Sequence, residues 1–242
     1  MAISEGSFRD RQGKAQSLRD ATAGFTPTFA PADTSLNATN FNTFISSIGA
    51  ANTSVETLAI NYTNNATTRV ALVKSIRSAV TQALGYVKSN KAWVNNFKAV
   101  KMAADKMRGV RPPSNTEPPP TPPPGEPVPP PEKSRNKGEQ AYVELAAHLG
   151  GFITAITACA GYAPTSADIS LSTFNGLLSQ FNGLNGFISS LASQLTTARE
   201  DRRRLYFDGD CLQTKFQSVK DAVKGQYGQN SSEYGTVKGI KW

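Results

Sequence analysis

A proline-rich stretch divides this chain into two parts of similar length. Residues 112–132 read PPSNTEPPPTPPPGEPVPPPE and hold twelve of the fifteen prolines in the 242-residue sequence. Proline fixes its own φ angle and lacks an amide donor, so this stretch can join neither the interior of a helix nor that of a sheet. We therefore expect residues 112–132 to form an extended polyproline II linker between two folded parts, residues 1–111 and residues 133–242.

The two folded parts resemble each other in sequence. The segment Ala21-Thr-Ala-Gly-Phe-Thr-Pro-Thr28 matches Ala158-Cys-Ala-Gly-Tyr-Ala-Pro-Thr165, and Asp33-x-Ser-Leu36 then matches Asp168-x-Ser-Leu171. Chance similarity between two helices rich in Ala, Ser and Thr would explain a shared apolar periodicity, but not a shared turn followed by a second motif in the same order. The sequence thus predicts a tandem duplication of a helical unit.

Helical periodicity dominates both parts and predicts an all-α fold. Apolar residues recur at alternating spacings of four and three through residues 41–62 and 174–195, which is typical of a helix that faces other helices. No segment shows the period-two alternation of a strand. We expect first helices over residues 8–23 and 138–160, and a separate third helix over residues 67–89. The two parts could pack as one bundle with approximate two-fold symmetry or as two adjacent bundles.

Two asparagines stand at equivalent places in the apolar stripes. A polar residue at such a position lowers stability but can fix helix register and partner choice, because its amide must find a hydrogen-bond partner. We predict that Asn52 and Asn185 are buried interaction residues that set register, with a bond between the two amides as one form of this. The alternative is that each lies at the solvent edge of its stripe. The matching Arg69 and Arg202 predict a shared structural role, such as a bond to a carbonyl at a helix end.

The first part is distinctly basic, and its basic residues concentrate near its end. Residues 1–111 carry 14 basic and 6 acidic groups, whereas residues 133–242 carry 12 and 9. Residues 88–111 form a candidate basic amphipathic helix, which can bind an anionic membrane, a calmodulin-like groove or nucleic acid phosphates. The alternative is that its apolar ridge packs on the bundle and its lysines face solvent. The predicted interaction residues are Lys88, Lys91, Trp93, Phe97, Lys98, Lys101, Lys106, Arg108 and Arg111.

Catalytic and metal-binding patterns do not emerge from the sequence. The single His148 has no Cys, Asp or Glu at ligand or relay spacing, and Cys159 and Cys211 are too few for a zinc site or a disulfide framework. No phosphate-binding loop, dinucleotide fingerprint or nucleophile motif is present. We therefore predict no enzyme activity, no cofactor, no metal and no small-molecule substrate.

Residues 141–163 form the most apolar segment of the second part. Glu144, His148 and the pair Gly150-Gly151 favour a central bundle helix over a membrane span. The N-terminal residues show no apolar run after their charges, so we expect no secretory signal and a cytoplasmic protein, with export by a non-classical route as the alternative.

The C-terminal residues resemble a known group of proteins. They contain the pattern Val219-Lys220-x-x-Val223-Lys224-x-x-Tyr227-Gly228, followed by Glu233-Tyr234 and Gly239-Ile240-Lys241. This pattern is similar to the ending of a group of small, uncharacterised helical bacterial proteins. The resemblance implies an all-helical bundle of bacterial origin and implies no activity.

Taken together, these patterns favour a non-enzymatic structural or protein-interaction bundle, one that binds itself or another protein. A module that binds anionic membranes or nucleic acids through residues 88–111 is the second hypothesis. A membrane-active helical protein is the third.

Overall fold

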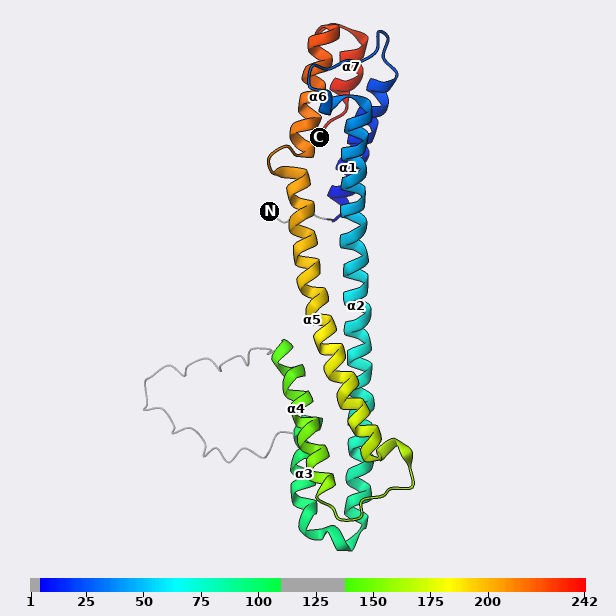
Figure 1. Cartoon of the computed structure of the whole chain (residues 1–242), viewed down its shortest axis with the longest axis vertical. Helices are drawn as coiled ribbons and strands as arrows, with labels where there is room; N and C mark the ends of the chain where they lie inside the picture. The colour runs from blue at the N-terminus through cyan, green and yellow to red at the C-terminus, as the bar shows by residue number, and fades with distance from the viewer. Residues whose placement is uncertain (1–4, 110–137) are drawn as a thin grey trace, which may run out of the picture. The chain divides into compact units, whose positions relative to one another are not determined.

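The computed structural model describes residues 5–109 and 138–242, which form helices joined by turns (Figure 1). The helices are α1 (Glu5–Ala23), α2 (Ala38–Ser89), α3 (Val94–Arg108), α4 (Gly138–Thr157), α5 (Leu171–Phe207), α6 (Leu212–Tyr227) and α7 (Ser232–Gly239), with 3-10 turns η1 (Thr34–Leu36), η2 (Lys91–Trp93) and η3 (Ala167–Ile169). No strand occurs in these two ranges, so the all-α prediction is confirmed. The predicted linker at 112–132, together with Arg111, lies outside the described residues.

Local sequence sets the first turn of each of the two long helices. The Ser170 hydroxyl accepts a hydrogen bond from the Thr173 amide (3.1 Å) at the start of α5, and the Asn37 side chain accepts one from the Asn40 amide (2.8 Å) at the start of α2. Both residues satisfy an amide that the first helical turn leaves free. Between α5 and α6 the chain passes Gly209, whose φ of 65° suits glycine.

The expected separate helix over residues 67–89 is wrong, because α2 runs without interruption from Ala38 to Ser89. The helix continues through a run of polar residues near position 65, which could have ended it. Instead the Thr63 hydroxyl bonds the Ala59 carbonyl (2.9 Å) and the Thr68 hydroxyl bonds the Asn64 carbonyl (3.0 Å), each one turn back along the helix. Because each hydroxyl finds its hydrogen-bond acceptor within the helix, these polar residues do not end it.

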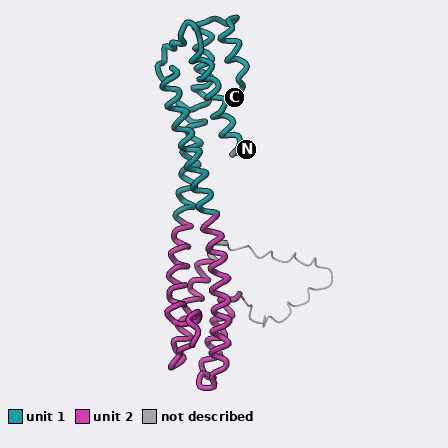
Figure 2. Tube along the Cα trace, turned by 90° about the vertical axis from the view of Figure 1, so that its right-hand side faces the viewer, with its two compact units in different colours: residues 1–63, 190–242 teal, residues 64–189 magenta. Residues whose placement is uncertain are grey.

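The described residues belong to two compact units, which Figure 2 shows in different colours. Unit 1 contains residues 1–63 and 190–242, and unit 2 contains residues 64–189. Each unit therefore takes residues from both sides of the predicted linker, whereas we expected domain boundaries at the linker. The long helices explain the difference, because α2 and α5 each contribute one end to either unit.

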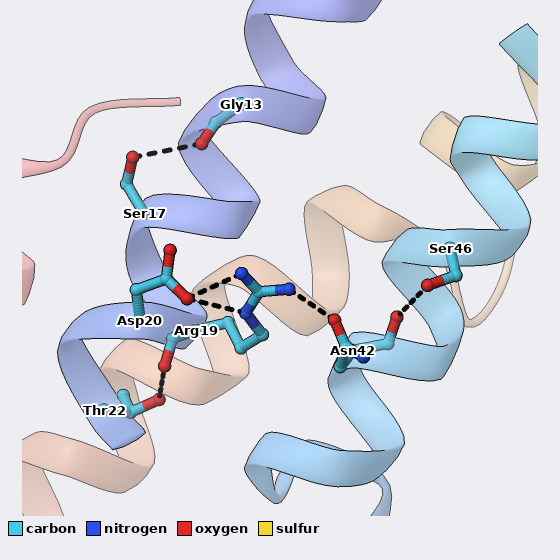
Figure 3. A network of polar contacts seen from close by, with 7 residues as sticks. All are labelled: Gly13, Ser17, Arg19, Asp20, Thr22, Asn42 and Ser46. Atoms are coloured by element: carbon cyan, nitrogen blue, oxygen red, sulfur yellow. Dashed lines mark hydrogen bonds and ion pairs between the residues drawn. The ribbon is translucent and has the colours of Figure 1, made fainter. Parts of the chain in front are cut away.

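Unit 1 is built around the first half of α2. Its core includes Phe41, Ile45 and Ile48 of α2, together with Tyr206 of α5 and Phe216 of α6. Helix α1 packs on α6 and α7. A polar network also joins α1 to α2: the Arg19 guanidinium donates to the Asn42 side chain and to Asp20 (Figure 3).

Unit 2 has a core of its own, formed by one end of each long helix and by α3 and α4. Phe174 and Phe181 of α5 are fully buried there, as the apolar stripe predicted. Helices α3 and α4 lie side by side, as Figure 1 shows. Leu149, Phe152 and Ile156 of α4 fill the space between the helices. Unit 2 thus joins α3 from one sequence part to α4 from the other.

Candidate functional site

The apolar ridge of the predicted basic helix lies in the core of unit 2. Trp93 is 4% exposed, its Nε1 donates to the Ala160 carbonyl (2.9 Å), and its ring packs against Tyr86 and Tyr162. Phe97 is half-buried against the same core. These aromatic side chains hold the bundle together, so they are not available as a membrane or partner anchor.

The basic side chains of this region stay at the surface. Lys88, Lys91, Lys98, Lys101 and Lys106 are exposed, and Arg108 is half-buried. The Asp105 carboxylate pairs with the Lys101 ammonium at 2.7 Å and also with the Arg108 guanidinium. Hydrogen bonds from Lys101 and then Arg108 lower the pKa of Asp105. The surface that remains is cationic along one side of α3.

At one of these lysines, Lys106, helices α3 and α4 form an open groove. It has a volume of about 440 Å³ and a mainly apolar lining. The residues that line it are Ala99, Met102, Ala103 and Lys106 of α3, and Ala147, His148, Gly151, Thr154 and Ala155 of α4. We call this surface the α3–α4 groove.

The groove exists because its floor consists of small side chains. Ala147, Gly151 and Ala155 follow one another at one-turn spacing on α4, and Ala99 and Ala103 do the same on α3. A Cβ atom added to Gly151 would meet nothing within 4 Å. Rows of small residues on neighbouring helices leave room for a further helix to approach closely.

The sequence did not indicate this groove as a site, although the small residues that line it are visible there. The missing information was the pairing of α3 with α4. The rim of the α3–α4 groove also carries a large apolar side chain, Met102, which is 57% exposed. His148, which we expected to be a core or boundary residue, is half-buried in the lining.

Asn52 occupies a buried polar network in unit 1. It is 4% exposed, and its Nδ2 donates to Gln12 Oε1 (2.8 Å) and to the Tyr206 hydroxyl (2.9 Å). The Tyr206 hydroxyl in turn donates to the Phe8 carbonyl (2.8 Å). The network joins α1, α2 and α5, which is the kind of arrangement that can fix helix register.

Asn185 lies in unit 2 and is only half-buried. Its Oδ1 accepts a hydrogen bond of 3.4 Å from Arg69 Nη1, and the Arg69 guanidinium lies 3.7 Å from the centre of the Tyr142 ring. The two asparagines do not bond each other, because each pairs with residues of its own unit. Arg202, the counterpart of Arg69, stacks on the Phe8 ring at 4.0 Å. Stacking of the guanidinium on an aromatic ring is a contact that these two arginines share.

The remaining candidates from the sequence are the two cysteines, a metal site and a membrane span. Cys159 and Cys211 are buried free thiols, and burial raises the pKa of Cys159. In the described ranges, no three His, Cys, Asp or Glu side chains come together as a metal site. The helices in those ranges, α4 included, are too short or too polar to span a membrane.

Comparison with known proteins adds no relative to this picture. A scan against protein-family models, a search of curated proteins and a search of solved structures each found no match. The candidate site therefore rests on the geometry of the α3–α4 groove alone.

Proposed function

We propose that this chain is a non-enzymatic interaction protein whose α3–α4 groove binds an amphipathic helix of a protein partner. The observation that carries the proposal is the groove itself, with an apolar floor of small residues, the exposed Met102 on its rim and Lys106 in its lining. Helix-in-groove recognition uses this combination, in which apolar anchors enter the groove and charges at its border select the partner.

The charge and the length of the groove define the kind of helix that it can bind. Lys98, Lys101 and Lys106 are exposed on α3, and Lys106 lines the groove directly. A partner helix with a glutamate or aspartate on the flank that meets Lys106 would complement its charge. The α4 side of the groove runs from Ala147 to Ala155, a rise of about 12 Å, so roughly two helical turns of the partner would be in contact. The flexible Met102 side chain can adapt to different anchors.

A synthetic peptide tests the proposal. The probe is a fluorescein-labelled amphipathic helix with leucines on one face and glutamates on both flanks, and the readout is fluorescence anisotropy with the full chain. We expect saturable binding. A peptide with lysines in place of the glutamates should bind at least tenfold more weakly, because one of its flanks would face Lys106.

A plugged variant supplies the specific control. Gly151→Leu should fill the groove without a clash, since the added Cβ meets no atom within 4 Å, and it should weaken peptide binding at least tenfold. Gly85→Leu is the matched control, because Gly85 is also an exposed helical glycine with free space around it. Equal binding by the two variants, or no binding of the acidic peptide to the wild type, would contradict the proposal.

Binding to an anionic surface is the second candidate, and the five exposed lysines from Lys88 to Lys106 favour it. Near them, Val94 (70% exposed) and Met102 are the large exposed apolar side chains of α3, which leaves little to insert into a bilayer. Sedimentation with vesicles of anionic lipid, and gel shift with duplex DNA, should then show binding that disappears as salt rises. Absence of binding at low salt would rule this candidate out.

A further inference from the structure

Each unit contains one cluster in which an arginine stacks on an aromatic ring near an asparagine. In unit 1, Arg202 lies over the Phe8 ring, which also contacts the Tyr206 ring at 4.8 Å, and Asn52 bonds the Tyr206 hydroxyl. In unit 2, Arg69 lies over Tyr142 and bonds Asn185. The two clusters use the same kinds of residue, so a difference between them is informative.

The difference lies one helical turn after each arginine. In unit 1 this position is Tyr206, which is fully buried and closes the cluster with its hydroxyl. In unit 2 it is Val73, which has neither a ring nor a hydroxyl. A partly enclosed cavity of about 100 Å³ lies against the unit 2 cluster. Its lining residues are Arg69, Tyr142, Val143, Asn185, Ile188 and Ser189.

Hydrogen-bond donors dominate the polar part of this lining. In the part of the chain that the structure describes, no carboxylate pairs with Arg69 and no acceptor lies within reach of its buried Nε. Asn185 uses its Oδ1 to accept from Arg69, which leaves its amide hydrogens free to donate. Ser189 is an exposed residue and lines the same cavity. A half-buried guanidinium without an anionic partner is costly, and an acceptor in the cavity would offset that cost.

We infer that this cavity binds a small oxyanion, held by the Arg69 guanidinium with the Asn185 amide and the Ser189 hydroxyl. The Tyr142 ring covers one face of the guanidinium and leaves the edge for oxygen acceptors, where a planar carboxylate or a phosphate binds best. Val143 and Ile188 form an apolar wall, which favours a carboxylate with a short aliphatic tail over phosphate. The cavity has room for several water molecules, and therefore for a ligand of this size.

This site is independent of the α3–α4 groove, and it can be tested separately. The probes are sodium acetate and inorganic phosphate, titrated into the full chain at constant ionic strength set with sodium chloride. The readout is the ¹H–¹⁵N spectrum, including the Asn185 side-chain amide. We expect saturable shifts at Asn185 and Ser189 with millimolar affinity, as suits a ligand of few atoms, and tighter binding of acetate than of phosphate.

Two variants and their controls decide the outcome. Arg69→Gln should weaken acetate binding at least tenfold, whereas Arg203→Gln, which removes the same charge from an exposed site, should not. Ser189→Ala should weaken acetate binding severalfold. Because Ser189 is exposed, this variant should fold even if Arg69→Gln does not, and the test then still applies. Ser193→Ala, an exposed serine on the same helix, is its control. Tighter phosphate binding would still support an oxyanion site, with phosphate as its ligand. Shifts that do not saturate, or that persist unchanged in Ser189→Ala and Arg69→Gln, would overturn the inference.

Discussion

Removal of one buried hydroxyl should measure how much the Asn52 network stabilises unit 1. The substitution Tyr206→Phe keeps the ring, and with it the edge-to-face contact with Phe8 at 4.8 Å, so only the hydroxyl is lost. That hydroxyl accepts from Asn52 Nδ2 at 2.9 Å and donates to the Phe8 carbonyl at 2.8 Å. Burial raises the pKa of the phenol, so the hydroxyl remains protonated and able to donate at neutral pH.

The expected cost follows from these two bonds. A buried hydrogen bond contributes about 1 kcal/mol net, so the loss of both should destabilise the chain by about 2 kcal/mol. The cost should not be much larger, because Asn52 keeps its bond to Gln12 Oε1 at 2.8 Å. With an m-value of about 2 kcal/mol per molar, the urea midpoint followed by circular dichroism should fall by about 1 M at unchanged m.

A control and a coupled variant make the prediction specific. Tyr62→Phe should change stability by less than about 0.5 kcal/mol, because the Tyr62 hydroxyl bonds nothing within the described part of the chain. Asn52→Ala combined with Tyr206→Phe should show a coupling of about 1 kcal/mol. If Tyr206→Phe is as stable as the wild type, Asn52 and Tyr206 are not bonded in solution and the network does not fix helix register.

Three further predictions test the cores of the two units, each taken by itself. In a Trp242→Phe background, Trp93 should show blue-shifted fluorescence emission and slow quenching by iodide, since its side chain is almost fully buried. Emission at the wavelength of a solvent-exposed tryptophan would show that Trp93 is not in the core. Burial raises the pKa of Tyr162 to about 12, whereas the unfolded phenol ionises near pH 10, so the unfolded state binds fewer protons in this window. The stability that Tyr162 contributes should therefore be fully present below about pH 10 and be lost as pH rises to about 12. If the urea midpoint of Tyr162→Phe falls over this pH range as much as that of the wild type, the prediction is contradicted. Proteolytic cleavage between Pro113 and Pro131 should leave two fragments that co-elute, because each core contains residues from both sides of that stretch; separate elution would show that each fragment folds alone.

Local sequence was sufficient for the elements of this fold. The stripe residues Phe41, Ile45, Phe174 and Phe181 are buried as their spacing predicted. The expected first helices also match α1 and α4 to within three residues at each end. Periodicity and glycine turns act within a few residues of chain, so they can be read without knowledge of the partner helices.

The pairing of these elements was decided only in the tertiary structure. Trp93 and its lysine neighbours suit a surface helix and a core helix equally well, and the contact with Ala160, far along the chain, settled the choice. The α3–α4 groove and the cavity beside Arg69 are also products of pairing, because each is lined by residues from both sides of the predicted linker. An apolar stripe determines that a helix must be covered, but many other stripes could cover it equally well. The choice among them depends on how side chains interlock across the whole core, which no single segment encodes.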